Sequence, residues 1–229
     1  MCPVGPSLFG TVGVDEAGRG PMIGPLVVCG VLFDDVSLKN LPSLGLRDSK
    51  TLSPTRRQEY AELIESHATR ICTRYISASE IDEHRARGVS LNELEIRKFI
   101  EILQVLRPLV AYVDAADVKA KRFGDSIGTR SGLWNEGCKI VSEHKADTKY
   151  PIVSAASIIA KVERDRMISQ FHEQYGDFGS GYPSDERTVS FVRELVISKE
   201  PIPPIIRRSW ESVKRIVAEL ETKQTILDL

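Results

Sequence analysis

The chain lacks closely spaced cysteines and any apolar run long enough to cross a bilayer. Its four cysteines form no CxxC, which argues against a disulfide framework or a zinc site and favours buried, reduced thiols. The longest apolar run, residues 26–33, is interrupted by Gly30 and is far too short to span a membrane. Because no basic segment precedes an apolar one at the N-terminus, we expect no signal peptide and a cytoplasmic protein.

An excess of charge of either sign is also absent, since 31 Lys and Arg residues oppose 32 Asp and Glu residues. Binding to nucleic acid would therefore need a local basic patch. There is no Walker A sequence, and the glycines of residues 18–24 have the wrong spacing for a dinucleotide fingerprint. A length of 229 residues allows one domain with a full core, with or without a small appendage.

The pattern of apolar residues, caps and turns predicts a mixed α/β protein. The expected strands are residues 9–14, 26–33, 70–76, 109–113 and 139–143. The expected helices are residues 54–67, 77–88, 90–106, 153–175, 186–198 and 209–223. Residues 131–137 and 176–185 are expected loops. We expect a catalytic α/β domain over residues 1–175 and a helical C-terminal region over residues 176–229.

Two adjacent carboxylates, Asp15 and Glu16, follow the first expected strand and lead directly into a Gly18-Arg19-Gly20 turn. Crowded carboxylates repel one another unless a cation holds them, and hard divalent cations prefer oxygen ligands. Glycines allow a backbone to come close to a ligand. Acidic residues are also common in solvated turns, so this segment alone leaves a metal site and an ordinary turn as alternatives.

Two further aspartates favour the metal site. Asp114 ends a second apolar strand, and Asp147 lies just before the long expected helix. Polar groups at the ends of strands in an α/β sheet converge, and four such carboxylates fit a two-metal site for phosphoryl transfer. Four other residues remain rivals or helpers: Asp48, Asp117, Asp125 and His144.

Two later segments have both a structural and a functional interpretation. A run of small residues, 154–157, opens the long helix, and Lys161, Arg164 and Arg166 follow it. Close helix–sheet packing with a solvated basic face explains this pattern as well as contacts to phosphates do. Tyr182 lies in the second expected loop, where a lone tyrosine is usually structural but can stack on a sugar or base beside a nucleic-acid site.

Together these segments resemble the type 2 ribonuclease H family (ribonuclease HII), and the later ones are similar to its single-chain archaeal branch. The matching motifs, in family order, are residues 13–21 (GVDEAGRGP), 48–50 (DSK), 112–115 (YVDA), 144–147 (HKAD), 154–161 (SAASIIAK), 179–185 (GSGYPSD) and 208–210 (RSW). The resemblance implies a ribonuclease H-like fold, with a mixed five-stranded sheet flanked by helices and a helical C-terminal extension. The Gly- and Trp-containing residues 131–137 are the main departure.

The resemblance also implies an activity. Members hydrolyse the RNA strand of RNA/DNA hybrids and cut 5′ to a single ribonucleotide in duplex DNA, leaving a 3′-hydroxyl and a 5′-phosphate. Two Mg²⁺ or Mn²⁺ ions are implied, with four catalytic ligands: Asp15, Glu16, Asp114 and Asp147. The implied readers of the ribose 2′-OH are the backbone of Gly18, Arg19 and Gly20 and the Tyr182 hydroxyl. The implied contacts to the nucleic-acid backbone are Ser49, Lys50, Lys161 and Arg164.

Two rival functions remain. One is a two-metal DNA nuclease of the same fold, such as a resolvase or integrase, which would not need a Gly-Arg-Gly turn and Tyr182 to read a 2′-OH. The other is a non-catalytic hybrid-binding protein, which would not need four carboxylates. Residues 223–229 resemble the start of a motif that binds the sliding clamp PCNA, but the chain stops before the aromatic pair, so an ordinary helix tail is the alternative. We expect a monomer.

Overall fold

The structure is a computed structural model that describes residues 7–46, 52–199 and 201–227. The strands are β1 (Thr11–Ala17), β2 (Leu26–Phe33), β3 (Arg70–Ile76), β4 (Val110–Asp114) and β5 (Lys139–Glu143). The α-helices are α1 (Asp35–Asn40), α2 (Pro54–His67), α3 (Ala78–Ala86), α4 (Leu91–Leu106), α5 (Ala120–Ser131), α6 (Ala146–Lys149), α7 (Pro151–Tyr175), α8 (Glu186–Ser198) and α9 (Glu211–Leu227). Two 3₁₀ helices are η1 (Leu41–Leu44) and η2 (Leu133–Glu136).

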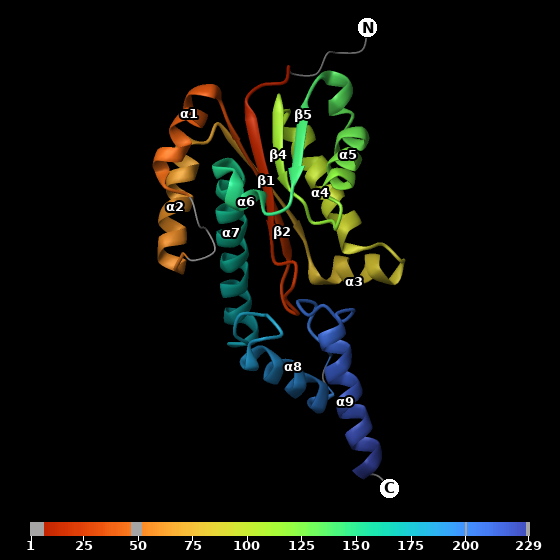
Figure 1. The fold of residues 1–229 in the computed structure, drawn as a ribbon. Coiled ribbons are helices and arrows are strands. Elements are labelled where there is room, and N and C mark those ends of the chain that lie inside the picture. The colour runs from red at the N-terminus through yellow and green to blue at the C-terminus, as the bar shows by residue number, and fades with distance from the viewer. Residues whose placement is uncertain (1–6, 47–51, 200, 228–229) are drawn as a thin grey trace. The chain divides into compact units, whose positions relative to one another are not determined.

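The strands form one mixed sheet in the order β3-β2-β1-β4-β5. β1 runs antiparallel to β2 and parallel to β4, and β4 runs parallel to β5. Figure 1 shows α4 and α5 on one side of this sheet and α7 and α2 on the other. The expected mixed five-stranded sheet flanked by helices is confirmed.

Because successive side chains of the central strands point to opposite faces, the two faces of the sheet carry different residues. Val12 and Val14 of β1, with Ala111 and Val113 of β4, are fully buried in a hydrophobic core shared with α4 and α5. The alternate residues of β1, beginning with Gly13, face α7. This hydrophobic core therefore lies on one face of the sheet, and α7 packs closely against the other face at Gly13.

The structure corrects three local predictions. β1 continues through Ala17 rather than ending at Asp15, because residues 15–17 pair with β2. Helices α1, α5 and α6 had not been predicted; α5 buries Phe123 and Ile127, one helical turn apart, against the sheet. The expected loop at residues 131–137 contains η2. Short helices rich in polar residues and glycine give a weak periodic signal, and tertiary packing determines them.

The chain divides into two compact units. The first comprises residues 1–17, 27–75 and 92–163, and the second comprises residues 18–26, 76–91 and 164–229. The second unit has its own hydrophobic core, in which Met22, Ile23, Phe178 and Ile206 are buried. It includes the whole of residues 176–229 together with three earlier stretches. The domain boundary expected after residue 175 stays a prediction.

Three of the four cysteines, Cys29, Cys72 and Cys138, are free and buried, as the sequence indicated; Cys2 lies outside the described residues. Burial raises the pKa of the Cys29 thiol to about 12, so it stays protonated near neutral pH. Within the described ranges, no helix has the length and apolar character needed to cross a membrane.

Candidate active site

The register of β1 and β4 brings Asp15 and Asp114 together in the first unit. Gly13 lies opposite Tyr112 and Val14 opposite Val113, so the next pair along these parallel strands is Asp15 and Asp114. Side chains at the same level of neighbouring parallel strands point to the same face. Both carboxylates therefore face the α7 side.

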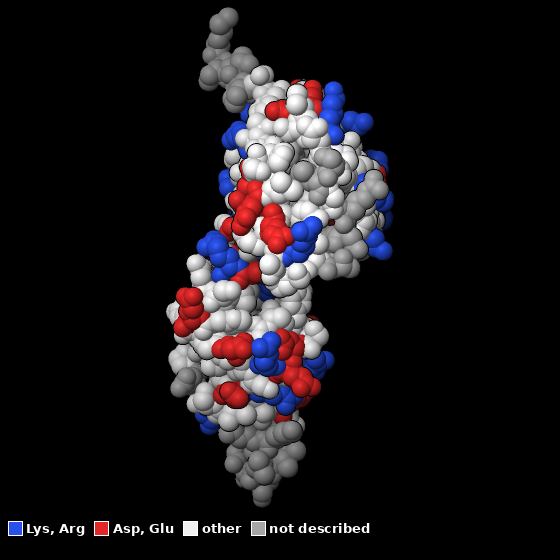
Figure 2. Space-filling view, turned by 90° about the vertical axis from the view of Figure 1, so that its left-hand side faces the viewer, with Lys and Arg blue, Asp and Glu red and all other residues white. Residues whose placement is uncertain are grey.

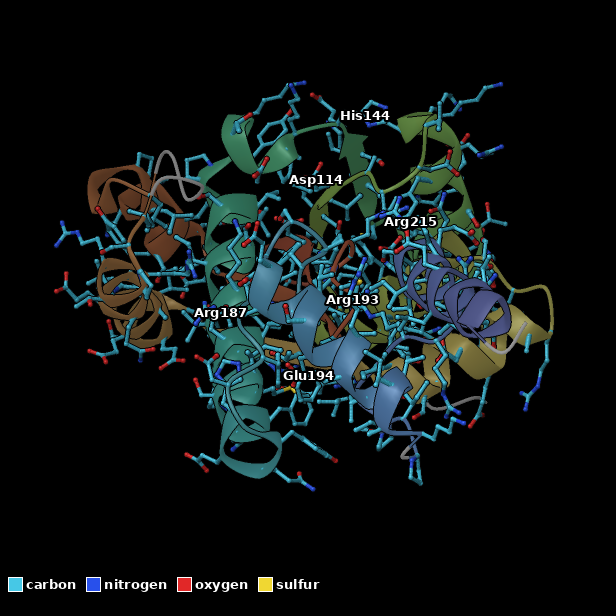
Figure 3. All side chains as sticks on the ribbon, turned by 90° about the horizontal axis from the view of Figure 1, so that it is seen from below. Asp114, His144, Arg187, Arg193, Glu194 and Arg215 are labelled. Atoms are coloured by element: carbon cyan, nitrogen blue, oxygen red, sulfur yellow. The ribbon has the colours of Figure 1, made fainter. Side chains whose placement is uncertain are left out.

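Helix α6 supplies the third carboxylate, that of Asp147. The backbone N–H of Ala146 donates to Asp114 Oδ1 over 3.2 Å, which ties the first turn of α6 to the end of β4. Lys145, just before α6, has a left-handed backbone (φ 55°) that turns the chain after β5. Asp147 follows directly and is buried. Asp15, Asp114 and Asp147 each place a carboxylate oxygen within 4.8 Å of the others (Asp114 is labelled in Figure 3).

Glu16 is not part of this group of three. Because β1 continues to Ala17, Glu16 is an interior strand residue, and its side chain leaves the strand on the opposite side from Asp15. Its charge is still close enough to raise the pKa of Asp15. A direct role for Glu16 as a metal ligand stays a prediction.

Asp15 lies where a negative charge is costly, since it is only 4% exposed. Burial raises its pKa well above that of an ordinary aspartate, and the nearby charges of Glu16 and Asp114 raise it further. Two hydrogen bonds lower the Asp15 pKa. One comes from the Ser157 hydroxyl, and the other comes from the Glu16 N–H to Asp15 Oδ1 over 2.8 Å. Three hard oxygen donors that repel one another fit a divalent cation such as Mg²⁺ or Mn²⁺.

Gly13 sets the distance between β1 and α7. A Cβ atom at this position would lie 2.1 Å from the Ile152 carbonyl oxygen and 2.7 Å from the Val153 nitrogen. Both are backbone atoms, so no side-chain rotation could relieve the clash. Two residues further along the strand is Asp15, and about one turn further along the helix is Ser157. The glycine therefore lets Ser157 approach Asp15.

We expect Gly13→Ala to destabilise the protein by about 1–3 kcal/mol or more, because α7 would have to move away from β1. It should also weaken Mn²⁺ binding, measured by calorimetry. Gly124→Ala is the matched control, since its Cβ would meet the Ser142 side chain at 2.7 Å where α5 packs on β5. The control should lower the unfolding temperature and leave Mn²⁺ affinity unchanged; equal Mn²⁺ affinities in the two variants would contradict the role given to Gly13.

The described rival residues, Asp117, Asp125 and His144, are not part of this group. Both Asp117 oxygens bind the Arg122 guanidinium, and Oδ1 also accepts from the Lys119 N–H, an arrangement that lowers the Asp117 pKa. Asp125 forms a surface ion pair with Lys121. His144 is exposed and is not part of the group of three carboxylates; it is labelled with Asp114 in Figure 3. Three predicted residues lie outside the described part of the chain: Asp48, Ser49 and Lys50.

In the second unit, the carbonyls of the Gly18-Arg19-Gly20 turn are held by two side chains from residues 207–210. Arg207, which is fully buried, donates from Nη2 to Gly18 O at 2.6 Å, from Nη1 to Arg19 O at 3.1 Å and from Nε to Gly24 O at 3.0 Å. Trp210 donates from Nε1 to Gly20 O at 3.3 Å and stacks under the Arg207 guanidinium. Sequence reasoning missed Arg207.

The fixed carbonyls determine where the amides point. In a trans peptide the C=O and the following N–H are antiparallel. With Gly18 O and Arg19 O directed at Arg207, the N–H groups of Arg19 and Gly20 point away from it. Gly18 itself has φ 90°, and a Cβ there would meet Pro25 O and the Arg164 side chain at 2.5–2.6 Å. Two neighbouring N–H groups are thus presented on one side of the turn.

Tyr182 lies beside this turn in the same unit. The Gly181 carbonyl accepts from the N–H groups of Met22 at 2.7 Å and Ile23 at 3.2 Å, which joins the tyrosine loop to the chain just after the turn. The Tyr182 ring lies 3.8 Å from the point where a Gly20 Cβ would be. Its side chain is 38% exposed, so it is available to a ligand.

The two predicted basic contacts have defined internal partners. Arg164 is only 5% exposed, donates to the Ile23 carbonyl at 3.1 Å and lies over the Tyr182 ring at 5.3 Å. Burial lowers the pKa of its guanidinium. Lys161 donates to the Ser157 hydroxyl at 2.9 Å. Contacts of either residue to a nucleic-acid backbone stay predictions.

Acidic and basic side chains are interspersed on the face drawn in Figure 2, in keeping with the near-zero net charge. Many surface charges of the described residues are paired with one another, such as Arg193 with Glu219 at 2.9 Å and Arg187 with Asp177 at 2.9 Å. Paired surface charges of this kind contribute little individually to stability.

Comparison with known proteins agrees with this architecture. The family model described as Ribonuclease HII matches residues 12–213. A Ribonuclease HII of Pyrococcus furiosus is 46% identical over 219 residues, covering 95% of each chain. Another, of Methanocella arvoryzae, is 43% identical over 209 residues, covering 91% of this chain and 92% of that one.

Solved structures give the same result. The ribonuclease H2 of Pyrococcus horikoshii has a TM-score of 0.83 at 42% identity, over 92% of this chain and 98% of that chain. A chain from the PCNA:RNase HII complex of Archaeoglobus fulgidus has a TM-score of 0.82 at 44% identity, over 90% and 96%. With matches of this extent, the chain belongs to the ribonuclease HII family and is a ribonuclease H.

Proposed function

We propose that the protein hydrolyses the RNA strand of RNA/DNA hybrids and also cuts on the 5′ side of a single ribonucleotide embedded in duplex DNA. The observation that supports this most strongly is the convergence of Asp15, Asp114 and Asp147 at the ends of β1 and β4 and on α6. These three carboxylates, together with that of Glu16 as the fourth predicted ligand, would hold Mg²⁺ or Mn²⁺. Because the overall charge of the chain is nearly neutral, this cluster of carboxylates is a local feature and not part of a generally acidic protein.

In the proposed reaction a water oxygen attacks the phosphorus on the 5′ side of the ribonucleotide. A P–O bond forms as the bond to the preceding 3′ oxygen breaks. The products are a 3′-hydroxyl upstream and a 5′-phosphate on the ribonucleotide. Divalent cations at such a site supply activation of the water and stabilisation of the leaving oxygen. The contribution of the chain is to fix the three carboxylates on strand ends and on the anchored helix α6.

Recognition of the ribose 2′-OH is assigned to the Gly18-Arg19-Gly20 turn and Tyr182. The outward-pointing N–H groups of Arg19 and Gly20 can donate to a hydroxyl oxygen, and the exposed Tyr182 ring can stack on a sugar. A DNA-specific nuclease has no use for donors directed at a 2′-OH. The proposed contacts of Ser49, Lys50, Lys161 and Arg164 to the phosphate backbone belong to the same proposal.

Binding to a sliding clamp is a further proposal for residues 223–229. It is supported by the relative from Archaeoglobus fulgidus, whose structure was determined as a PCNA:RNase HII complex. Helix α9 extends to Leu227, while residues 228–229 lie outside the described part. The cytoplasmic location and the monomeric state remain predictions.

A duplex carrying one ribonucleotide, labelled at its 5′ end, tests the proposal. We expect a single cut 5′ to the ribonucleotide with Mg²⁺ or Mn²⁺, no cut with a chelator, and no cut in an all-DNA duplex of the same sequence. Cleavage of the all-DNA duplex would favour the two-metal DNA nuclease. Cleavage of a continuous hybrid alone would remove the single-ribonucleotide part of the proposal, and binding without cleavage would favour a non-catalytic protein.

A further inference from the structure

A chain of hydrogen bonds in the first unit runs from Lys161 through Ser157 to Asp15. The Lys161 ammonium donates to the Ser157 hydroxyl oxygen over 2.9 Å, and the Ser157 hydroxyl in turn donates to the Asp15 carboxylate. Ser157 is only 1% exposed, so water does not compete freely for its hydroxyl. The chain ends on the most buried of the carboxylates that converge in this site.

The order of donors in this chain is fixed by chemistry. An ammonium group has three protons and no lone pair, so Lys161 can only donate. A hydroxyl has one proton, and when its oxygen accepts from Lys161 that proton remains for a single acceptor. The acceptor is Asp15. A serine without the lysine could rotate its hydroxyl toward a backbone carbonyl of its own helix instead.

The backbones of α7 and β1 hold Lys161, Ser157 and Asp15 in place for these hydrogen bonds. Ser157 and Lys161 are four residues apart on α7 and therefore lie on the same face of the helix. The close contact of Gly13 with the Ile152 carbonyl sets how near that face comes to β1. The Glu16 N–H donates to Asp15 Oδ1 from the strand itself. The carboxylate of Asp15 is thus held from the strand and from the helix at once.

We infer that Ser157, oriented by Lys161, is a positioning residue that fixes the Asp15 carboxylate so that its remaining lone pairs face Asp114 and Asp147. Lys161 then acts on the reaction through Ser157 and not primarily through the nucleic-acid backbone. This inference rests on the proposed function, because it takes Asp15 to be a metal ligand. It predicts that the two residues affect cation affinity even when no substrate is present.

The test measures Mn²⁺ binding to the full chain by isothermal titration calorimetry without nucleic acid. Ser157→Ala and Lys161→Met should each weaken Mn²⁺ affinity about tenfold, as loss of a group that orients a metal ligand commonly does. The double variant should be no weaker than the worse single variant, because both substitutions break the same chain. Circular dichroism and thermal unfolding in chelator establish that each variant is folded.

Ser154→Ala is the matched control. Ser154 is equally buried, lies one turn earlier on α7 and donates to the Leu46 carbonyl at 2.5 Å instead. Its substitution should leave Mn²⁺ affinity at the wild-type value. Hybrid affinity in chelator is measured in parallel at several salt concentrations, and Lys161→Met should lower it by a smaller factor than it lowers Mn²⁺ affinity.

Wild-type Mn²⁺ affinity in Ser157→Ala would overturn the inference, as would additive losses in the double variant. Reduced hybrid affinity and a smaller salt slope in Lys161→Met, with normal Mn²⁺ binding, would instead make Lys161 a phosphate contact. Failure of the proposed function looks different. In that case the wild-type protein itself would bind no Mn²⁺, and its cleavage of the hybrid would not depend on a divalent cation.

Discussion

Asp114→Asn is expected to lower metal-dependent cleavage of an RNA/DNA hybrid roughly 1000-fold, which corresponds to about 4 kcal/mol of transition-state stabilisation. Asparagine keeps the oxygen that accepts from the Ala146 N–H, so the anchor between β4 and α6 should survive. What is lost is one negative charge of the three that converge. Single-turnover kinetics at saturating Mg²⁺ and Mn²⁺ measure the effect.

The same variant should be more stable than the wild-type protein when metal is removed. The Asp15 pKa is raised above its usual value of 3.8, so between those two values the folded state binds a proton that the unfolded chain has lost. Stability therefore falls as pH rises through that window, and it stays lower above it. Asp114→Asn removes one cause of the raised Asp15 pKa. Thermal unfolding in chelator should therefore show a smaller loss of stability between pH 5 and pH 8 for this variant than for the wild-type protein.

Asp117→Asn is the control for both measurements. Asp117 is a buried aspartate near Asp114 in sequence, but its oxygens bind Arg122 and the Lys119 N–H. The Asp117→Asn variant should cleave the hybrid at the wild-type rate. It should be less stable than the wild-type protein, because the charge of Asp117 is favourably paired with Arg122. Activity of Asp114→Asn within a few-fold of the wild type, or equal loss in both variants, would contradict the assignment of the site.

Arg207→Met is expected to reduce kcat/KM at a single embedded ribonucleotide roughly 10- to 100-fold while leaving Mn²⁺ affinity unchanged. Without the guanidinium, the carbonyls of Gly18, Arg19 and Gly24 lose their donors. The turn is then free to rotate its peptide planes, and the N–H groups of Arg19 and Gly20 lose their fixed direction. Loss of these bonds to two buried carbonyls and one half-buried carbonyl also costs about 3 kcal/mol of stability.

Activity is therefore measured at a temperature where the variant is fully folded. Arg208→Met removes the same charge from the neighbouring, exposed position and should change neither activity nor stability appreciably. Arg207→Lys keeps the charge but cannot donate to the three carbonyls in the same geometry, so its kcat/KM should lie between those of the wild type and Arg207→Met. A folded Arg207→Met with normal kcat/KM would mean that Arg207 only supports the fold.

The sheet and the pair Asp15 and Asp114 were accessible from the sequence, because apolar runs that end in aspartates are local patterns. The direction of Glu16 was not. Whether a residue ends a strand or continues it depends on the partner strand, and β2 pairs with β1 through Ala17. The expected strand, residues 9–14, ends three residues before the observed one, so the alternation that separates Asp15 from Glu16 could not be foreseen, and the role of Glu16 as a metal ligand stays a prediction.

Arg207 and Ser157 could not be assigned for a different reason. The carbonyls that bind Arg207 are separated from it by more than 180 residues, and one of two adjacent arginines after an apolar pair carries no periodic signal. Ser157 stood out only as one of several small residues at the start of a helix. Its contact with Asp15 depends on the close approach that Gly13 permits.

Anomalous diffraction from crystals soaked in Mn²⁺ tests the central claim most directly, because it locates the cation without reference to activity. The account predicts a manganese peak within bonding distance of the carboxylates of Asp15, Asp114 and Asp147, and its loss in crystals of Asp114→Asn. Manganese bound only elsewhere, in a protein that still cleaves the hybrid, would contradict it.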